Sequence, residues 1–177
     1  MIFALHERPR GVETGDGLRV VYDLERNEAH FGAACVDGPA LVWELGDDAD
    51  SSLAVEVELN AAVEWIVRCD RVDFPPGSVA HRHVHPGPGI RRLLFGELTI
   101  DGEDATHTYV TGGAWFEAAD YPVVATASAT EETAFARVVL LPREWAGKRT
   151  IRYLDPADEE KPKLQRAQVL LEEPLRL

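Results

Sequence analysis

The stretch Pro76-Gly-Ser-Val-Ala-His-Arg-His-Val-His-Pro-Gly-Pro-Gly-Ile-Arg-Arg-Leu-Leu-Phe-Gly96 decides the predicted fold, because it places three of the six histidines of the chain in strict alternation. Successive side chains of a β-strand point to opposite faces, so His81, His83 and His85 are predicted to share one face of a strand. A helix would not align them, since residues two apart on a helix diverge by roughly 200°. Imidazole is the commonest protein ligand for metals, so this face is a candidate metal site. The alternative is a strand whose histidines are satisfied by hydrogen bonds in a polar pocket.

The spacing around these histidines resembles the first motif of the cupins, small β-barrels of the double-stranded β-helix type. Five residues separate Gly77 from the pair His83-x-His85, and Gly96 follows His85 by eleven positions. In the family, a Glu completes this motif after three further residues, seven positions before the glycine. Both counts reach Gly89 in this chain, so the resemblance implies a site that lacks its carboxylate.

Residues 111–128 match the second motif of the family, which opens on a glycine and contains one more ligand histidine. Counted from Gly113, the position of that histidine is Val124 in this chain. The two motifs together span residues 74–128, and only the two histidines of the first motif carry over as metal ligands. The resemblance therefore implies an all-β fold: a double-stranded β-helix, or jelly-roll barrel, of the RmlC-like cupin type with extra terminal strands.

The length and composition of the chain predict one domain. A chain of 177 residues with 45% hydrophobic content is long enough for one substantial core and short for two. We therefore predict a single cupin domain over residues 1–177. Its core motifs occupy 74–141, with an N-terminal extension over 1–60 and a C-terminal extension over 142–177.

Short apolar segments between glycines and prolines predict an antiparallel barrel. Residues 1–16 carry several such breakers and are predicted to form an irregular lead-in. A polar turn is predicted at 47–52, and a slip in the apolar parity at 69–71 predicts a bulge or bend. Strands are predicted over residues 18–24, 38–46, 53–59, 63–74, 90–100, 122–127, 133–141, 149–153 and 165–177.

The charge balance argues against a nucleic-acid partner. The 18 basic against 31 acidic residues give a net charge of −13, whereas binding a phosphate backbone requires clustered Lys and Arg. The first residues show no charged leader followed by an apolar run, and no stretch approaches the ~20 apolar residues that span a bilayer. We therefore expect a cytoplasmic protein without a membrane partner.

Three further side chains are candidates for the site. His81 precedes His83 by two residues, so it is either a third metal ligand or a residue at the barrel rim, beyond reach. Glu117 either completes a facial arrangement of two His and one carboxylate, or it is a Glu at a strand end or paired with an Arg. Arg91 follows Gly89 by two, so alternation directs it to the same interior. There it either grips a carboxylate or phosphate, or bridges to an acid such as Glu117.

The remaining histidines and the two cysteines are assigned no chemistry. His6, His30 and His107 stand in polar or loop contexts and are predicted to lie at the surface. Cys35 and Cys69 lack the spacing of metal ligands, and they are predicted to be buried thiols.

The resemblance supports two functions that the residues do not separate, because cupins host many chemistries. The first is a metal-dependent enzyme, dioxygenase-like, acting on a small anionic or aromatic substrate. Its cofactor is a divalent transition metal (Fe, Mn, Ni or Zn) held weakly by His83 and His85, since water replaces the missing donors. The alternative is a non-catalytic binding module that holds a small anionic molecule. Cupin-like chains with extra terminal strands commonly pair them, so a homodimer through residues 169–175 is also expected.

Overall fold

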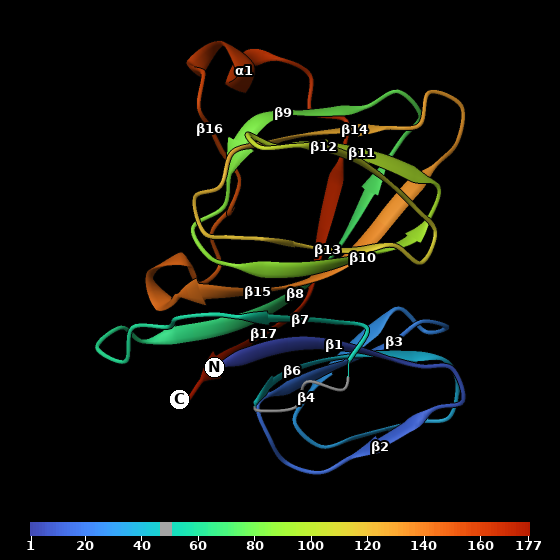
Figure 1. Ribbon diagram of the computed structural model, residues 1–177, viewed down its shortest axis with the longest axis vertical. Helices are drawn as coiled ribbons and strands as arrows, with labels where there is room; N and C mark the ends of the chain where they lie inside the picture. The colour runs from blue at the N-terminus through green and yellow to red at the C-terminus, as the bar shows by residue number, and fades with distance from the viewer. Residues whose placement is uncertain (47–50) are drawn as a thin grey trace.

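The described part of the chain, residues 1–46 and 51–177 of a computed structural model, is built almost entirely from strands. Figure 1 shows an N-terminal sheet packed against one side of a barrel. The N-terminal sheet has the order β4-β3-β6-β1-β7, from β1 (Ile2–Arg8), β3 (Arg19–Asp23), β4 (Glu28–Phe31), β6 (Ala40–Gly46) and β7 (Leu53–Glu56). A two-stranded sheet joins β2 (Val12–Thr14) to β5 (Ala34–Val36).

Two five-stranded antiparallel sheets form the barrel. The sheet next to the N-terminal layer has the order β13-β10-β15-β8-β17, from β8 (Trp65–Phe74), β10 (Gly89–Phe95), β13 (Ala114–Glu117), β15 (Thr133–Pro142) and β17 (Arg166–Leu175). The opposite sheet has the order β12-β11-β14-β9-β16, from β9 (Val79–Val84), β11 (Glu97–Asp101), β12 (Thr106–Val110), β14 (Val123–Ala127) and β16 (Arg152–Tyr153). This is the double-stranded β-helix of the cupin type, so the predicted all-β fold with extra terminal strands is confirmed.

The only helical segments in the described chain are short. They are the 3₁₀ turn η1 (Arg143–Trp145) and the helix α1 (Pro156–Glu160), both in the connection between β15 and β17. A search of the described residues finds no helix with the length and apolar character that crossing a membrane requires.

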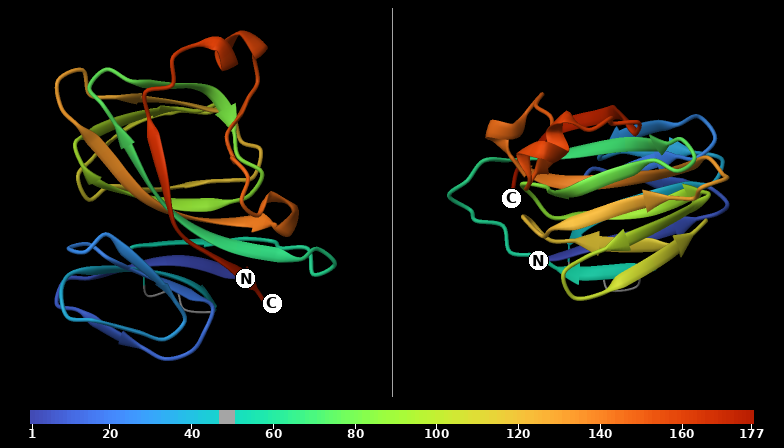
Figure 2. Two further views of the ribbon diagram at one scale, coloured as in Figure 1. Left: turned by 180° about the vertical axis from the view of Figure 1, so that it is seen from behind. Right: turned by 90° about the horizontal axis from the view of Figure 1, so that it is seen from above.

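Strand β8 is buried on both faces, which explains why its apolar parity slips in the sequence. Val67 and Cys69 pack into the core shared with the N-terminal sheet, whereas Arg68 and Asp70 face the barrel interior. The bulge predicted at 69–71 is on the neighbouring strand instead: β17 shifts register between Val169 and Leu171, opposite Asp70 and Cys69. Figure 2 shows β17 running beside β8 along the barrel. Pairing within the chain thus uses one edge of this tail, and the homodimer expected through it stays a prediction.

The prediction of an irregular lead-in over residues 1–16 is wrong, because β1 is an inner strand of the N-terminal sheet. Phe3 and Leu5 face the barrel and join its core. His6, predicted to lie at the surface, is buried on the opposite face, in register with Val42 under the two-stranded sheet. Both faces of β1 are covered, so its sequence lacks the alternation that marks a half-buried strand.

The other minor predictions have mixed outcomes. His30 and His107 are exposed and Cys69 is buried, as predicted, but Cys35 is exposed because it lies on the short edge strand β5. The late strand predicted over 149–153 is confined to the two residues of β16. Residues 47–50 of the predicted polar turn lie outside the described residues.

The strand predicted over residues 90–100 is divided by Gly96 into β10 and β11, which belong to different sheets. Gly96 has a φ of +81°, and a Cβ at this position would lie 2.4 Å from the backbone oxygen of Glu132. A side chain is therefore excluded both by backbone conformation and by space. The glycine makes the corner through which the chain passes from one barrel sheet to the other.

Replacing Gly96 with Ala is expected to lower the free energy of unfolding by more than about 1 kcal/mol, from left-handed strain and steric overlap together. Urea denaturation followed by circular dichroism measures the effect. Gly15 is the matched control, because it has an ordinary φ and no atom within 4 Å of the position of its Cβ. Equal stability of the two Ala variants would contradict the role of Gly96 as a required corner.

Candidate functional site

The histidine strand β9 contains a bulge that separates His81 from the other two histidines. Val123 of β14 pairs with His83 and Ala125 pairs with Ala80, so two residues of β9 stand opposite one of β14. This extra residue reverses the alternation, and as a result Ala80 and His83 line the barrel cavity but His81 does not. The prediction that all three histidines share one face is therefore wrong for His81. His85, just beyond the end of β9, returns to the cavity.

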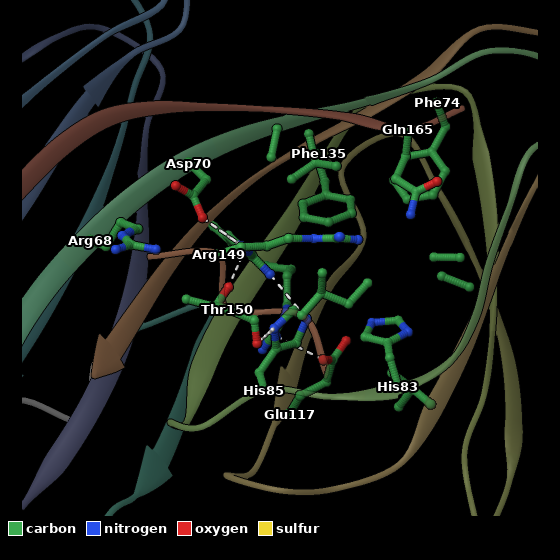
Figure 3. Close-up of a pocket in the computed structure, with 18 of the residues that line it drawn as sticks. Arg68, Asp70, Phe74, His83, His85, Glu117, Phe135, Arg149, Thr150 and Gln165 are labelled. Atoms are coloured by element: carbon green, nitrogen blue, oxygen red, sulfur yellow. Dashed lines mark hydrogen bonds and ion pairs between the residues drawn. The ribbon is translucent and has the colours of Figure 1, made fainter. Parts of the chain in front are cut away.

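The barrel encloses an open-mouthed cavity of about 520 Å³ between its two sheets. Figure 3 shows Asp70, Thr150, His85 and Glu117 on one side of this cavity, and Phe74 and Gln165 on the other. The apolar wall consists of Val72, Phe74, Ala80, Ile100, Trp115, Val123, Ala125 and Phe135. The polar floor contains His83, His85, Arg91, Glu117, Arg137, Asp70 and Thr150. The predicted site residues other than His81 therefore meet in one cavity; they are His83, His85, Arg91 and Glu117.

Both imidazole rings of the floor are neutral and held in a defined tautomer. The Nδ1 of His83 lies 2.7 Å from the backbone oxygen of His81, and the Nδ1 of His85 lies 3.3 Å from that of Thr150. A carbonyl oxygen only accepts, so in each ring Nδ1–H donates and Nε2 keeps its lone pair. Burial lowers the pKa of His83 and lowers the pKa of His85 well below its usual value; for His85 the nearby Arg137 and Arg91 add to this effect.

Arg91 and Glu117 form a fully buried ion pair on the facing strands β10 and β13. Arg91 Nη2 lies 2.7 Å from Glu117 Oε2, and the side chains are 1% and 8% exposed. The other oxygen, Oε1, accepts a hydrogen bond of 2.8 Å from the indole N–H of Trp115. Burial lowers the pKa of Arg91 to about 10, partly offset by Glu117, so the guanidinium remains charged at neutral pH. Of the alternatives open for these two residues, the ion pair is the one observed.

A second buried ion pair joins Arg137 of β15 to Asp70 of β8. Arg137 donates from Nε and Nη2 to Asp70 Oδ2 at 2.9 and 2.8 Å. Its Nη1 donates to His85 Nε2 at 3.1 Å, and its Nη2 also donates to the hydroxyl of Thr150 at 3.3 Å. The guanidinium therefore ties the floor of the cavity to the C-terminal segment through Thr150.

The mouth of the cavity is basic. Lys148, Arg149 and Lys163 line it from the segment between β15 and β17. Arg149 and Lys163 both lie against the ring of Tyr153, at 5.5 and 5.0 Å from its centroid. Arg68 fixes this segment by donating to the backbone oxygens of Trp145 and Lys148. The basic groups are thus held beside the cavity entrance.

The donor atoms at the floor do not fit a resident divalent metal in this arrangement. Both oxygens of Glu117 and both ring nitrogens of His85 are engaged with protein groups, and two guanidiniums stand next to them. Of the four ring nitrogens of His83 and His85, only His83 Nε2 has no hydrogen bond to the described residues. No group of three or more His, Cys, Asp or Glu side chains in the described chain is arranged to hold a metal ion. The metal predicted at His83 and His85 is tested by the titration described below.

Three residues of the floor were not identified from the sequence: Asp70, Arg137 and Thr150. Asp70 and Arg137 are buried charged residues on β8 and β15, two strands most of whose residues are buried. A charge at such a position requires a partner, which is a signal visible in the sequence without the identity of that partner. Thr150 lies in a connecting segment and carried no such signal.

Comparisons with known proteins cover only part of the chain. No family model and no curated protein matches the chain. An RmlC-like cupin from Shewanella frigidimarina is similar over 44% of this chain and 68% of its own, at 14% identity and a TM-score of 0.40. A cupin domain from Bordetella pertussis is similar over 42% and 81%, at 17% identity and a TM-score of 0.37. The polyketide cyclase RemF from Streptomyces resistomycificus is similar over 52% of this chain and 62% of its own, less than two thirds of that protein, at 15% identity and a TM-score of 0.41. The fold that the strand topology defines here, the cupin-type double-stranded β-helix, is also the fold named for the first two of these proteins.

Proposed function

We propose that the barrel binds a small molecule that has an apolar body and an acidic group, with no metal at the floor of the cavity. One observation carries the proposal. Six of the residues that line the cavity are Arg or Lys and only two are Asp or Glu, in a chain whose net charge is −13. An excess of positive charge around an apolar cavity of an acidic protein selects for anions.

The walls of the cavity supply the complementary apolar contact. Phe135 packs between two other rings, with its centroid 5.8 Å from that of Phe74 and 5.4 Å from that of Trp115. A volume of about 520 Å³ is within the range of roughly 300–1,000 Å³ that small-molecule sites occupy. A planar or branched hydrocarbon body therefore suits the wall. Its acidic group is placed toward the basic mouth, because the guanidiniums of the floor are already paired with Glu117 and Asp70.

The second candidate function is the metal-dependent, dioxygenase-like enzyme implied by the resemblance. It requires Glu117 and His85 to be released from Arg91 and Arg137 before they could ligate. This requirement favours the binding function.

The experiment compares matched acids and amides: benzoate with benzamide, 2-naphthoate with 2-naphthamide, and decanoate with decanamide. Metal-free protein is titrated with each by calorimetry, with thermal shifts as a second readout. At least one acid is expected to bind while its neutral amide binds roughly tenfold more weakly, because the amide lacks the charge that the basic residues attract. The Arg149→Met/Lys163→Met variant is expected to lose about the same factor for that acid.

The control variant is Arg10→Met, which removes an exposed positive charge away from the cavity and should leave binding unchanged. Equal affinity for every acid and its amide would contradict an anionic ligand. A loss that is the same in the control and in the mouth variant would contradict the placement of the acidic group near the mouth.

A further inference from the structure

We infer that the floor of the cavity is a divalent-cation site held closed by two arginines: Arg91 and Arg137 occupy the donor atoms of Glu117 and His85 and exclude a metal. The inference goes beyond ligand binding. In this inference the two guanidiniums take the place of a metal ion as the positive charges at the floor, and a chelator cannot remove them.

The Arg91 side chain lies over Gly89. Its Nη1 donates to the backbone oxygen of Gly89 at 2.7 Å, so the guanidinium folds back over that glycine. A Cβ on Gly89 would lie 3.0 Å from this Nη1 and 2.9 Å from the backbone oxygen of Val138. The space beside Gly89 is therefore already filled by a cationic group.

Arg91 already balances the charge of Glu117. Among the described residues its carboxylate is the one acidic group that forms an ion pair with Arg91, and its two oxygens are divided between Arg91 and the indole of Trp115. A dication approaching this carboxylate would meet a guanidinium that is 1% exposed and hence poorly screened by solvent. Repulsion and the loss of the ion pair both oppose metal binding.

Arg137 occupies a ring nitrogen of His85. Its Nε2 lone pair, the one that a metal would use, already accepts a hydrogen bond from Arg137. Arg137 is in turn fixed by two hydrogen bonds to Asp70, so it cannot swing away without leaving that carboxylate unpaired in the barrel. His85 Nε2 is therefore occupied by a guanidinium whose position is fixed by its ion pair with Asp70.

Without the two arginines, His83, His85 and Glu117 remain at the floor of the cavity. The rings of His83 and His85 lie with centroids 5.0 Å apart and planes at 82°, and Glu117 lines the same floor. Figure 3 shows the carboxylate of Glu117 in the same part of the cavity as the two rings. Two imidazoles and one carboxylate are a donor set that suits a divalent transition metal, with further positions for water. The three side chains are not grouped around one point in the described structure, so the opened site also requires Glu117 and His85 to turn once the arginines no longer hold them.

The test uses an opened variant, Asp70→Leu/Arg91→Met/Arg137→Met. Removing Asp70 together with Arg137 leaves no orphaned charge from that pair, because buried ion pairs can be replaced by apolar residues of similar volume. Glu117 loses its counter-charge with Arg91 and regains one only when a metal binds. Untagged wild-type protein, the opened variant and the opened variant with His83→Ala are stripped with a chelator, dialysed, and titrated with Ni²⁺ and with Zn²⁺ by calorimetry. Melting temperatures with and without metal are recorded in parallel, since a ligand of the folded state stabilises it.

The opened variant is expected to bind one equivalent of metal about tenfold to a hundredfold more tightly than the wild type, the range typical of changes to groups around metal ligands. His83→Ala should abolish the gain. A wild type that binds metal as tightly as the opened variant would overturn the inference, and so would an opened, folded variant that gains no affinity.

The wild-type titration does not depend on the folding of any variant. A second variant with a single arginine replaced tests the gain in affinity independently of the triple variant. Arg91→Met alone leaves the pair of Asp70 and Arg137 intact and frees only Glu117. It is expected to give a smaller gain in affinity that His83→Ala again removes, and no gain would count against the inference. The acid and amide titrations above are made without metal, so failure of the binding function and failure of the closed metal site are separately visible.

Discussion

Replacing Arg91 with Met is expected to lower the free energy of unfolding by about 3–5 kcal/mol, because it leaves the carboxylate of Glu117 buried without a counter-charge. The two side chains are 1% and 8% exposed, so water cannot take over the role of the guanidinium. Adding Glu117→Gln should recover at least half of this loss. The amide removes the orphaned charge and keeps an oxygen to accept from Trp115. Urea denaturation of the single and double variants, followed by tryptophan fluorescence, measures the difference.

The adjacent Arg92 is the matched control for this experiment. It points to the other side of the same strand and pairs at 3.3 Å with Glu7, whose side chain is 43% exposed. An ion pair that reaches water contributes little, so Arg92→Met is expected to change stability by less than about 1 kcal/mol. A loss at Arg91 no greater than that at Arg92 would show that the buried pair does not stabilise the fold.

The barrel could be predicted from the sequence because its corners are made by residues with few substitutes. Gly96 needs a left-handed φ and has no room for a Cβ, and its distance from the histidine strand is set by the length of β10. The first strand of the N-terminal sheet could not be predicted in the same way, although strands were predicted over residues 18–24, 38–46 and 53–59 of this sheet. Its inner strand β1 is covered on both faces, by the barrel at Phe3 and Leu5 and by the two-stranded sheet at His6, so alternation is absent.

The candidate site was predicted in part, and the outcome depended on the regularity of each strand. Alternation directed Arg91 to the interior correctly, because β10 is regular from Gly89 to Leu93 in its pairing with β15. The same reasoning was wrong for His81, since a bulge in β9 adds one residue that no local sequence pattern reveals. The ion pair of Asp70 and Arg137 could not be predicted for a different reason. The two residues are 67 positions apart in the chain, and a single sequence does not show which distant residues pair.

The largest effect after Arg91 is expected for Asp70, because its loss leaves Arg137 as an unpaired charge inside the barrel. Asp70→Leu is expected to cost about 3–5 kcal/mol of unfolding free energy, whereas Asp70→Leu/Arg137→Met should cost much less, since both charges then leave together. The side chains of the pair are 2% and 7% exposed, and the two hydrogen bonds of 2.9 and 2.8 Å make it specific. Urea denaturation of both variants, of Arg137→Met and of the wild type forms a complete double-mutant cycle.

Asp73→Leu gives the control on the same strand, because Asp73 pairs with Arg71 at 2.8 Å but its side chain is 39% exposed, so its loss is expected to cost less than about 1 kcal/mol. The cycle for Asp70 and Arg137 should return a coupling energy above about 1 kcal/mol, larger than the deviation from additivity found for independent sites. Additive losses would mean that Arg137 is stabilised by His85 and Thr150 rather than by Asp70. In that case Arg137 would remain in place without its carboxylate, and the reason given for its fixed position beside His85 would fail with it.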